Sequence, residues 1–302
     1  MVKEKPTKTK NTRKPAVKPV QKCTSPKRKG KKKVQKEVPA WCRYLLAVLV
    51  VIVFVSGFYW FFIRPYAYRW KPCYGLKGYG ICMPAGYQIH GIDISHYQGD
   101  VKWKMLEQTR QGQFPVSFIF MKATEGGDFA DDKFVENFDS ARAHGFIRGA
   151  YHFYNPKTDA NKQADFFIRS VKLEPGDLPP VLDIEKKSKD VKKLQDDLKI
   201  WLRKVESHYG VKPIIYASYK FKTKYLNDSV FDSYPYWIAH YYVDSVRYQG
   251  DWKFWQHTDV GTLPGIDEKV DFNIFNGSQM ELEELLLKKD RVCHSERSEE
   301  SR

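Results

Sequence analysis

The sequence lacks the motifs on which several large classes of enzyme depend. It has five cysteines in 302 residues, and no Cys/His spacing in it has the form of a zinc site. It contains no glycine-rich phosphate loop, no G-x-S-x-G nucleophile elbow and no dinucleotide-binding fingerprint. These absences argue against enzymes built on those motifs, and we expect neither a metal nor a cofactor.

Excess charge is also absent from most of the chain. The net charge is +15, but residues 1–43 hold 16 Lys and Arg against two Glu, which leaves the remainder close to neutral. This Lys-, Pro- and Thr-rich segment cannot bury enough apolar surface to fold, so it is predicted to be a disordered, cytoplasmic basic tail. Because it lacks interleaved aromatic residues, we expect no binding to nucleic acid and favour attraction to anionic lipid.

Charged residues are missing entirely from residues 44–63, YLLAVLVVIVFVSGFYWFFI. Twenty apolar residues suffice for a helix to cross a bilayer, and the aromatic residues at both ends suit the two interfaces. A cleavable signal peptide has a shorter apolar region, which is followed by a cleavage site of small residues. A helix buried in a protein core is rarely so long and so apolar. We therefore predict a single-pass inner-membrane anchor with a cytoplasmic N-terminus and a periplasmic or extracellular remainder.

Two of the cysteines, Cys73 and Cys82, lie close together in CYGLKGYGIC. Three glycines in this decapeptide permit a tight loop, so we predict a disulfide that stabilises it by about 2–3 kcal/mol. Residues 64–86 are assigned to a linker that contains this bridge.

From residue 87 to residue 288, short apolar runs alternate with amphipathic stretches. Helical periodicity covers Lys133–His144, Asp159–Ser170 and Lys189–Tyr209. Strands alternating with such helices indicate a parallel sheet, and eight strands in about 200 residues fit an α/β fold, a modified TIM-like (β/α) barrel whose later strands lack full helices. The eight predicted strands are Gln88–Ile94, Val116–Met121, Ile147–Tyr154, Val181–Glu185, Lys212–Ala217, Tyr236–Ala239, Trp252–Gln256 and Val270–Ile274.

The C-terminal part of the chain carries a helix signal and then loses periodicity. Ser278 and Glu281 have the spacing of a capping box, which predicts a last helix. Residues 289–302 are polar and aperiodic, so we predict a disordered tail there.

Four carboxylates fall on the predicted strands, and we expect them at strand ends, where barrel enzymes place their chemistry. Asp183 and Glu185 lie two residues apart on an apolar strand, so their side chains point to the same face. Simple surface exposure could explain that pair, and turn or helix caps could explain the other two. Their joint placement favours a single site, shared by all four residues, at the mouth of the barrel. The four residues are Asp93, Asp183, Glu185 and Asp271.

A cluster of carboxylates suits the cleavage of a glycosidic bond. Repulsion and burial should raise the pKa of one member and make it a general acid, while the others stabilise developing positive charge. Aromatic side chains near the same mouth would stack on sugar faces, although each could equally belong to ordinary core packing. These aromatic residues are Tyr151, Phe153, Tyr216 and Tyr241.

Seven stretches, in order over nearly 190 residues, resemble the glycoside hydrolase family 25 lysozymes, the Chalaropsis-type N-acetylmuramidases. They are GIDISHYQG, FIFMKATEG, FVENFDSARAHGFIRGAYHFY, PPVLDIE, PIIYAS, YWIAHY and FWQHTDVGTLPGIDEKVDFNIFNG. The resemblance implies a (β/α)5(β)3 barrel and hydrolysis of the β-1,4 bond between N-acetylmuramic acid and N-acetylglucosamine in peptidoglycan.

The same resemblance implies roles for individual residues. Glu185 matches the family's proton donor, and Asp183 matches the acid that assists the substrate's acetamido group. Asp93 and Asp271 match the family's two remaining active-site acids, while Tyr151, Tyr216 and Tyr241 look like sugar-contacting residues. One departure is Tyr97, which stands where many members have Trp.

Two other functions remain open at this stage. The barrel could be a non-catalytic module that tethers glycan to the membrane, although the intact acids count against this. It could also be a chitinase-like hydrolase of acetamido sugars with its own D-x-E pair, although the six other matching stretches count against that.

Overall fold

The computed structural model describes residues 39–64, 73 and 75–289. The chain divides into two compact units, residues 1–63 and 64–302. The tail predicted to precede the anchor lies almost wholly outside the described residues, and so does the tail predicted at the C-terminus.

In the first unit, Ala40–Phe58 form the helix α1, which continues as a π-helical turn over Tyr59–Ile63. The helix begins four residues earlier than predicted, because the amide of Cys42 already donates to the carbonyl of Pro39 at 2.9 Å. Within these 24 residues, a stretch of 18 has a mean hydropathy of 2.6 and buries nothing within the structure. By length and composition alone, this helix could cross a membrane.

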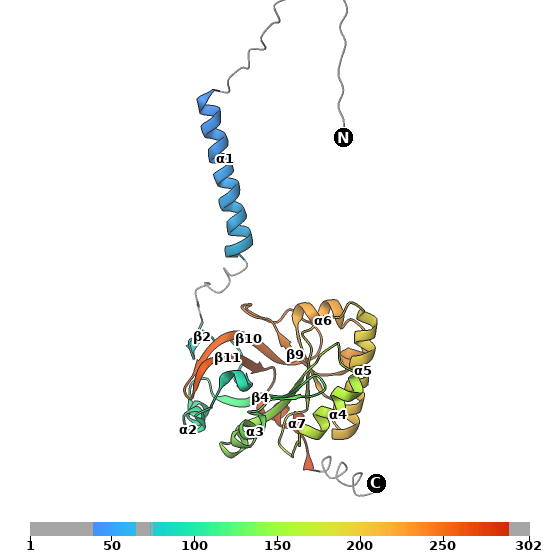
Figure 1. Cartoon of the computed structure of the whole chain (residues 1–302). Helices are drawn as coiled ribbons and strands as arrows, with labels where there is room; N and C mark the ends of the chain where they lie inside the picture. Colours follow the sequence, from blue (N-terminus) through green and yellow to red (C-terminus); the bar gives the residue numbers. More distant parts are fainter. Residues whose placement is uncertain (1–38, 65–72, 74, 290–302) are drawn as a thin grey trace, which may run out of the picture. The chain divides into compact units, whose positions relative to one another are not determined.

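The second unit is built on a closed barrel of eight strands, as predicted (Figure 1). Neighbours follow the order β3-β11-β10-β9-β8-β7-β6-β4, and pairing of β3 with β4 closes the ring. Seven strands run parallel, whereas β11 is antiparallel to both of its neighbours. The strands are β3 (His90–Ile94), β4 (Val116–Glu125), β6 (Ile147–Phe153), β7 (Val181–Asp183), β8 (Ile214–Ser218), β9 (Tyr236–Ala239), β10 (Trp252–Leu263) and β11 (Ile266–Phe275).

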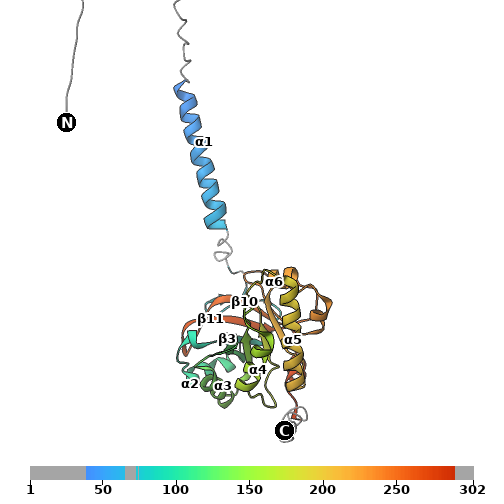
Figure 2. The same ribbon diagram turned by 45° about the vertical axis from the view of Figure 1, so that its right-hand side comes forward.

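Each of the first five barrel strands is followed by a helix before the next barrel strand, whereas no helix separates the last three strands, which gives the (β/α)5(β)3 arrangement. Figures 1 and 2 show α3, α4 and α5 on the outside of the strands. In α5 the apolar residues recur every three or four positions and are buried, which fixes this helix against the barrel. The helices are α2 (Trp103–Leu106), α3 (Phe134–Ala143), α4 (Ala160–Ser170), α5 (Val191–Tyr209), α6 (Tyr219–Tyr225) and α7 (Gln279–Leu285), with 3₁₀ turns η3 (His96–Gln98), η4 (Glu107–Gln111) and η5 (Ser229–Ser233).

Aromatic rings fill the interior of the barrel. Phe118 and Phe120 of β4 both contact Phe254 of β10, with ring centroids 5.1 and 5.0 Å apart, and Phe120 stacks on Trp237 of β9 at 4.3 Å. Rings of this size fit because a neighbouring strand lacks side-chain bulk: a Cβ at Gly91 would lie 2.4 Å from the ring of Phe118.

Gly91→Ala is therefore expected to destabilise the barrel by about 1–3 kcal/mol, because the added methyl group forces Phe118 out of its packed position. Thermal unfolding of the full chain in detergent measures the loss. The double variant Gly91→Ala/Phe118→Leu should recover part of it, because the smaller side chain makes room. An unchanged unfolding temperature in Gly91→Ala would contradict this account of the interior.

The last two strands differ from prediction. β10 and β11 form one long antiparallel hairpin, turning at Pro264 and Gly265, where Gly265 has a φ of 92° in the left-handed region. Because β11 is antiparallel to its neighbours, the rim formed by the carboxyl ends of the parallel strands lies beside the middle of β11, not beside its end. The expectation that Asp271 lies at a strand end is wrong for this reason. β7 also ends at Asp183, two residues short of prediction.

The segment predicted as a linker contributes to the fold. Strands β1 (Lys77–Gly78) and β2 (Ile81–Cys82) form a small hairpin, and Ile81 is buried in the core. Tyr79 at the turn stacks on a ring of β11 and accepts a hydrogen bond from the amide of Thr262 at 2.9 Å. A disulfide joins Cys73 to Cys82 with a Cα–Cα distance of 5.5 Å, and it closes this hairpin. Part of the predicted linker is thus docked on the barrel.

Candidate active site

Four acidic side chains line one pocket of about 170 Å³ at the carboxyl-end rim of the parallel strands. Asp93 on β3 and Asp271 on β11 are direct register partners. Asp183 ends β7, and Glu185 follows two residues later. Beyond β7 the chain remains paired with β8 for one more residue, because the amide of Ile184 donates to a backbone carbonyl of β8 at 3.0 Å. These acids come from three strands that lie far apart in the sequence.

Asp93 is buried and held from two sides. Its Oδ2 accepts hydrogen bonds from Gln256 Nε2 and from Asn273 Nδ2, both at 2.8 Å. Burial raises the pKa of Asp93 to about 7, opposed by these two hydrogen bonds and reinforced by the nearby charge of Glu185. The amides thus fix one oxygen of Asp93.

Asp271 and Asp183 also favour their protonated forms. Burial, followed by the charge of Asp93, raises the pKa of Asp271 to about 9, and the two carboxyl groups are hydrogen-bonded. Burial raises the pKa of Asp183 well above its ordinary value, and the charges of Glu185 and Asp93 add to the effect. Among the residues that the structure describes, no hydrogen-bond partner reaches Asp183 Oδ1.

Glu185 differs from the other three because its side chain is exposed at the mouth. Loss of hydration over the pocket is still the largest influence on its carboxyl group, and it raises the pKa of Glu185. Glu185 also lines a second, larger pocket of about 460 Å³, together with Tyr216 and Tyr241. It therefore stands between two adjoining cavities.

The predicted aromatic residues gather at this mouth, and two of them join the network around the acids. The hydroxyls of Tyr216 and Tyr241 both donate to Gln256 Oε1, at 2.7 and 2.6 Å. Tyr151 lines the acid pocket beside Trp237, with their ring centroids 6.4 Å apart. Gln256 thus links two tyrosines to Asp93.

Phe153 lines the same pocket but lies among cations. The ammonium groups of Lys122 and Lys186 lie 4.9 and 4.5 Å from its ring centroid. Glu125 accepts a hydrogen bond from each of these lysines, at 2.8 and 2.9 Å. Two positive charges therefore lie beside the Asp183–Glu185 pair, and both make cation–π contacts with the ring of Phe153.

Residues 92–266 match the family model of the Glycosyl hydrolases family 25. The chain belongs to this family. It is 40% identical over 224 residues to the uncharacterized protein YegX of Escherichia coli (strain K12), which covers 74% of this chain and 80% of YegX. It is 31% identical over 211 residues to Lysozyme M1 of Streptomyces globisporus, over 64% of this chain and 70% of that protein.

The fold agrees with that of a family 25 glycosyl hydrolase from Bacillus anthracis. That structure aligns with a TM-score of 0.60 and 33% identity, over 66% of this chain and 94% of the other. The residues that match the family model include Asp93, Asp183 and Glu185, whereas most of β11, with Asp271, follows the matched stretch.

Several residues of this family 25 pocket were not anticipated from the sequence. Gln256 and Asn273 hold Asp93, Trp237 donates to Asn273 Oδ1 at 2.8 Å, and Lys122 lies on the flank. The available signal was a polar side chain inside an otherwise apolar strand, as in FWQH and DFNIF. Burying such groups is costly unless they are paired, which indicates a polar partner inside the barrel.

Proposed function

We propose that this family 25 protein hydrolyses the glycan strands of peptidoglycan at the β-1,4 bond between N-acetylmuramic acid and N-acetylglucosamine. The observation that carries the proposal is the gathering of Asp93, Asp183, Glu185 and Asp271 around one pocket. Lysozyme M1, a relative at 31% identity, supports the choice of substrate. A pair of carboxyl groups beside an open cavity meets the requirement for cleaving a glycosidic bond.

In this proposal Glu185 donates the proton to the leaving sugar oxygen. It is the acid that stands at the open mouth, between the two cavities, where a glycosidic oxygen could reach it. Loss of hydration raises its pKa and so favours the protonated form that a general acid needs.

Asp183 orients the acetamido group of the sugar in the acid pocket. Its buried Oδ1, which lacks a partner among the described residues, can accept a hydrogen bond from the substrate N–H. The acetamido oxygen then bonds to the anomeric carbon as the bond to the leaving oxygen breaks. Water next attacks the same carbon while the Glu185 carboxylate takes its proton, so the anomeric configuration is retained. A product of inverted configuration would rule out this route.

In the same proposal, the helix α1 determines where the protein acts. As a single-pass anchor in the inner membrane, it would hold the barrel on the periplasmic or extracellular side, within reach of the cell's own envelope. Tyr151, Tyr216 and Tyr241 would contact sugar rings at the mouth.

Digestion of purified peptidoglycan by the full-length protein in detergent tests the bond that is cleaved. We expect new reducing ends, and borohydride reduction followed by mass spectrometry should find them on N-acetylmuramic acid. Reducing ends on N-acetylglucosamine would contradict the proposed bond. If binding occurs without any new reducing ends, the protein is a glycan tether and the proposal fails.

A further inference from the structure

Tyr97 is an exposed aromatic residue at the edge of the acid pocket. Its side chain lines that pocket, although 73% of the residue is accessible to solvent. A tyrosine ring exposed beside a polar cavity offers an apolar face on which a ligand can pack. No step of the proposed hydrolysis uses Tyr97.

The turn that carries Tyr97 is fixed at both ends. Ser95 and Gln98 form a capping box around η3, in which the amide of Ser95 donates to Gln98 Oε1 at 2.8 Å. The amide group of Gln98 donates in turn to the carbonyl of Lys269 on β11 at 3.1 Å. The turn is thereby tied to the barrel wall, next to the strand that carries Asp271.

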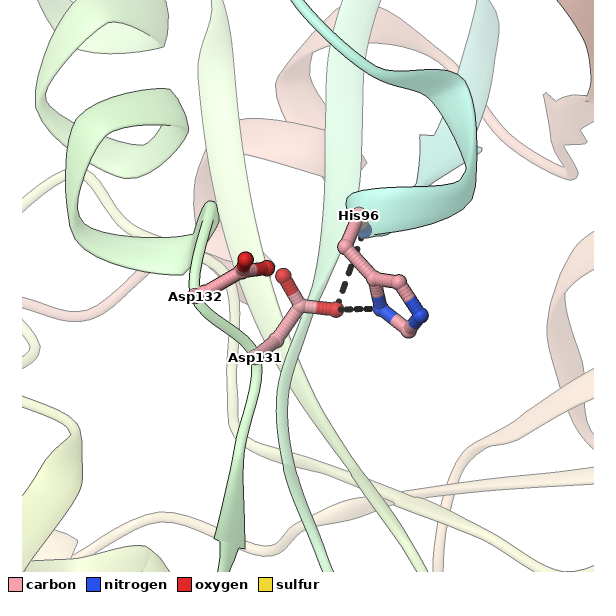
Figure 3. Close-up of side chains that lie close together, drawn as sticks. All are labelled: His96, Asp131 and Asp132. Atoms are coloured by element: carbon pink, nitrogen blue, oxygen red, sulfur yellow. Dashed lines mark hydrogen bonds and ion pairs between the residues drawn. The ribbon is translucent and has the colours of Figure 1, made fainter.

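A buried carboxylate fixes the middle of the same turn. Asp131 Oδ2 accepts from the amide of His96 at 3.0 Å and lies 2.7 Å from His96 Nδ1 (Figure 3). Asp132 completes a group of three possible metal ligands within 4.8 Å of one another, but these hydrogen bonds already explain the closeness of His96 and Asp131. The ring of His96 lies against that of Tyr97, with centroids 4.1 Å apart.

Phe129 of β5 (Phe129–Ala130) extends this surface. It is 45% exposed, and its ring meets the ring of His96 edge-on at 5.9 Å. Tyr97, His96 and Phe129 therefore form a continuous aromatic surface, called the rim platform below, beside the acid pocket. The hydrogen bonds described above hold the turn under it, so it is available to a ligand without a large loss of conformational entropy.

We propose that the rim platform binds a sugar ring of the glycan strand, with Tyr97 as the contacting residue and Asp131 as a positioning residue. The inference rests on the proposed function, because a glycan strand held at the acid pocket would extend past its edges, and Tyr97 lines one of them. Sugar rings present C–H groups that pack on aromatic faces, and the platform offers such a face outside the cavity that holds the acids.

Tyr97→Ala tests the contact by steady-state kinetics on purified peptidoglycan with the full-length protein in detergent. We expect KM to rise by about 3–10-fold, the size of one aromatic contact, with little change in kcat. Tyr97→Phe and Tyr97→Trp keep a ring and should keep the wild-type KM. Met280→Ala, which removes an exposed side chain on α7 outside both pockets, should leave KM and kcat unchanged.

Asp131→Asn tests the positioning role, because the neutral side chain weakens the link to His96 while keeping its volume. KM should rise in the same direction as for Tyr97→Ala, and the double variant should show less than the sum of the two effects. Equal unfolding temperatures for wild type and variant establish that the change is local. A fall in kcat with unchanged KM would overturn the positioning role.

Sedimentation of the protein with insoluble peptidoglycan separates the two proposals. If the wild type releases no reducing ends, the proposed hydrolysis fails, yet Tyr97→Ala should still bind less of the polymer than wild type. If the wild type is active and Tyr97→Ala neither binds more weakly nor raises KM, the rim platform is wrong and the hydrolysis stands.

Discussion

Glu185→Gln is expected to lower the rate at which reducing ends are released from peptidoglycan by about 10²–10⁴-fold. The amide has nearly the shape of the carboxylic acid but has no acidic proton to give to the leaving oxygen. Because Glu185 is exposed at the mouth, the substitution should leave the fold intact. Initial rates for the full-length protein in detergent, with muropeptides identified by mass spectrometry, measure the effect.

The pH dependence should change together with the rate. In the wild type, the rate falls as the pH passes the raised pKa of Glu185, because the general acid must be protonated. The residual activity of Glu185→Gln should lack this alkaline fall. As a matched control, Glu136→Gln alters an exposed carboxylate on α3 and should keep the wild-type rate. Equal, nonzero rates in wild type and Glu185→Gln would make the role of Glu185 untenable.

The architecture could be predicted because it follows from local patterns. Consecutive residues determine the burial pattern of a strand or an amphipathic helix. The sequence therefore predicts β9 at its observed bounds and the start of α5 to within two residues. The capping box at Ser278 likewise predicted α7, where Ser278 and Glu281 bond as their spacing suggests. Short parallel strands with intervening helices leave few possible topologies.

The features that escaped prediction depend on the partner of each strand. β10 and β11 were predicted as short strands, but antiparallel pairing extends both beyond their apolar residues. That pairing sets the register of Asp271 against Asp93, which no local pattern reveals. The same applies to Gln256 and Asn273, whose role becomes visible only when their strands bring them beside Asp93.

Asp271→Asn is expected to stabilise the protein against unfolding, by an amount that grows with pH. The pKa of Asp271 rises from 3.8 in an unfolded chain to about 9 in the folded protein, chiefly through burial and then through the charge of Asp93. Above pH 3.8 the unfolded chain releases this proton and the folded protein retains it, so the wild type loses stability progressively until about pH 9. Asparagine does not titrate and can still donate a hydrogen bond to Asp93.

The gain should therefore vanish near pH 4 and reach about 2–4 kcal/mol at pH 8. Urea unfolding of the full chain in detergent, followed by fluorescence at both pH values, measures it. Asp267→Asn is the matched control, because Asp267 lies on the same strand with 79% of its side chain exposed. A gain that is equal at the two pH values would contradict the assignment to a buried, proton-retaining carboxyl group.

The same variant should lose hydrolytic activity while it gains stability. Asp271 lies in the rim pocket beside Asp93, and the two carboxyl groups cannot both ionise at low cost, since neighbouring carboxylates repel each other. Such a cluster costs folding free energy and is useful only where positive charge develops on a bound substrate. Opposite changes in stability and activity therefore distinguish a catalytic group of acids from a structural one, in which both properties would fall together.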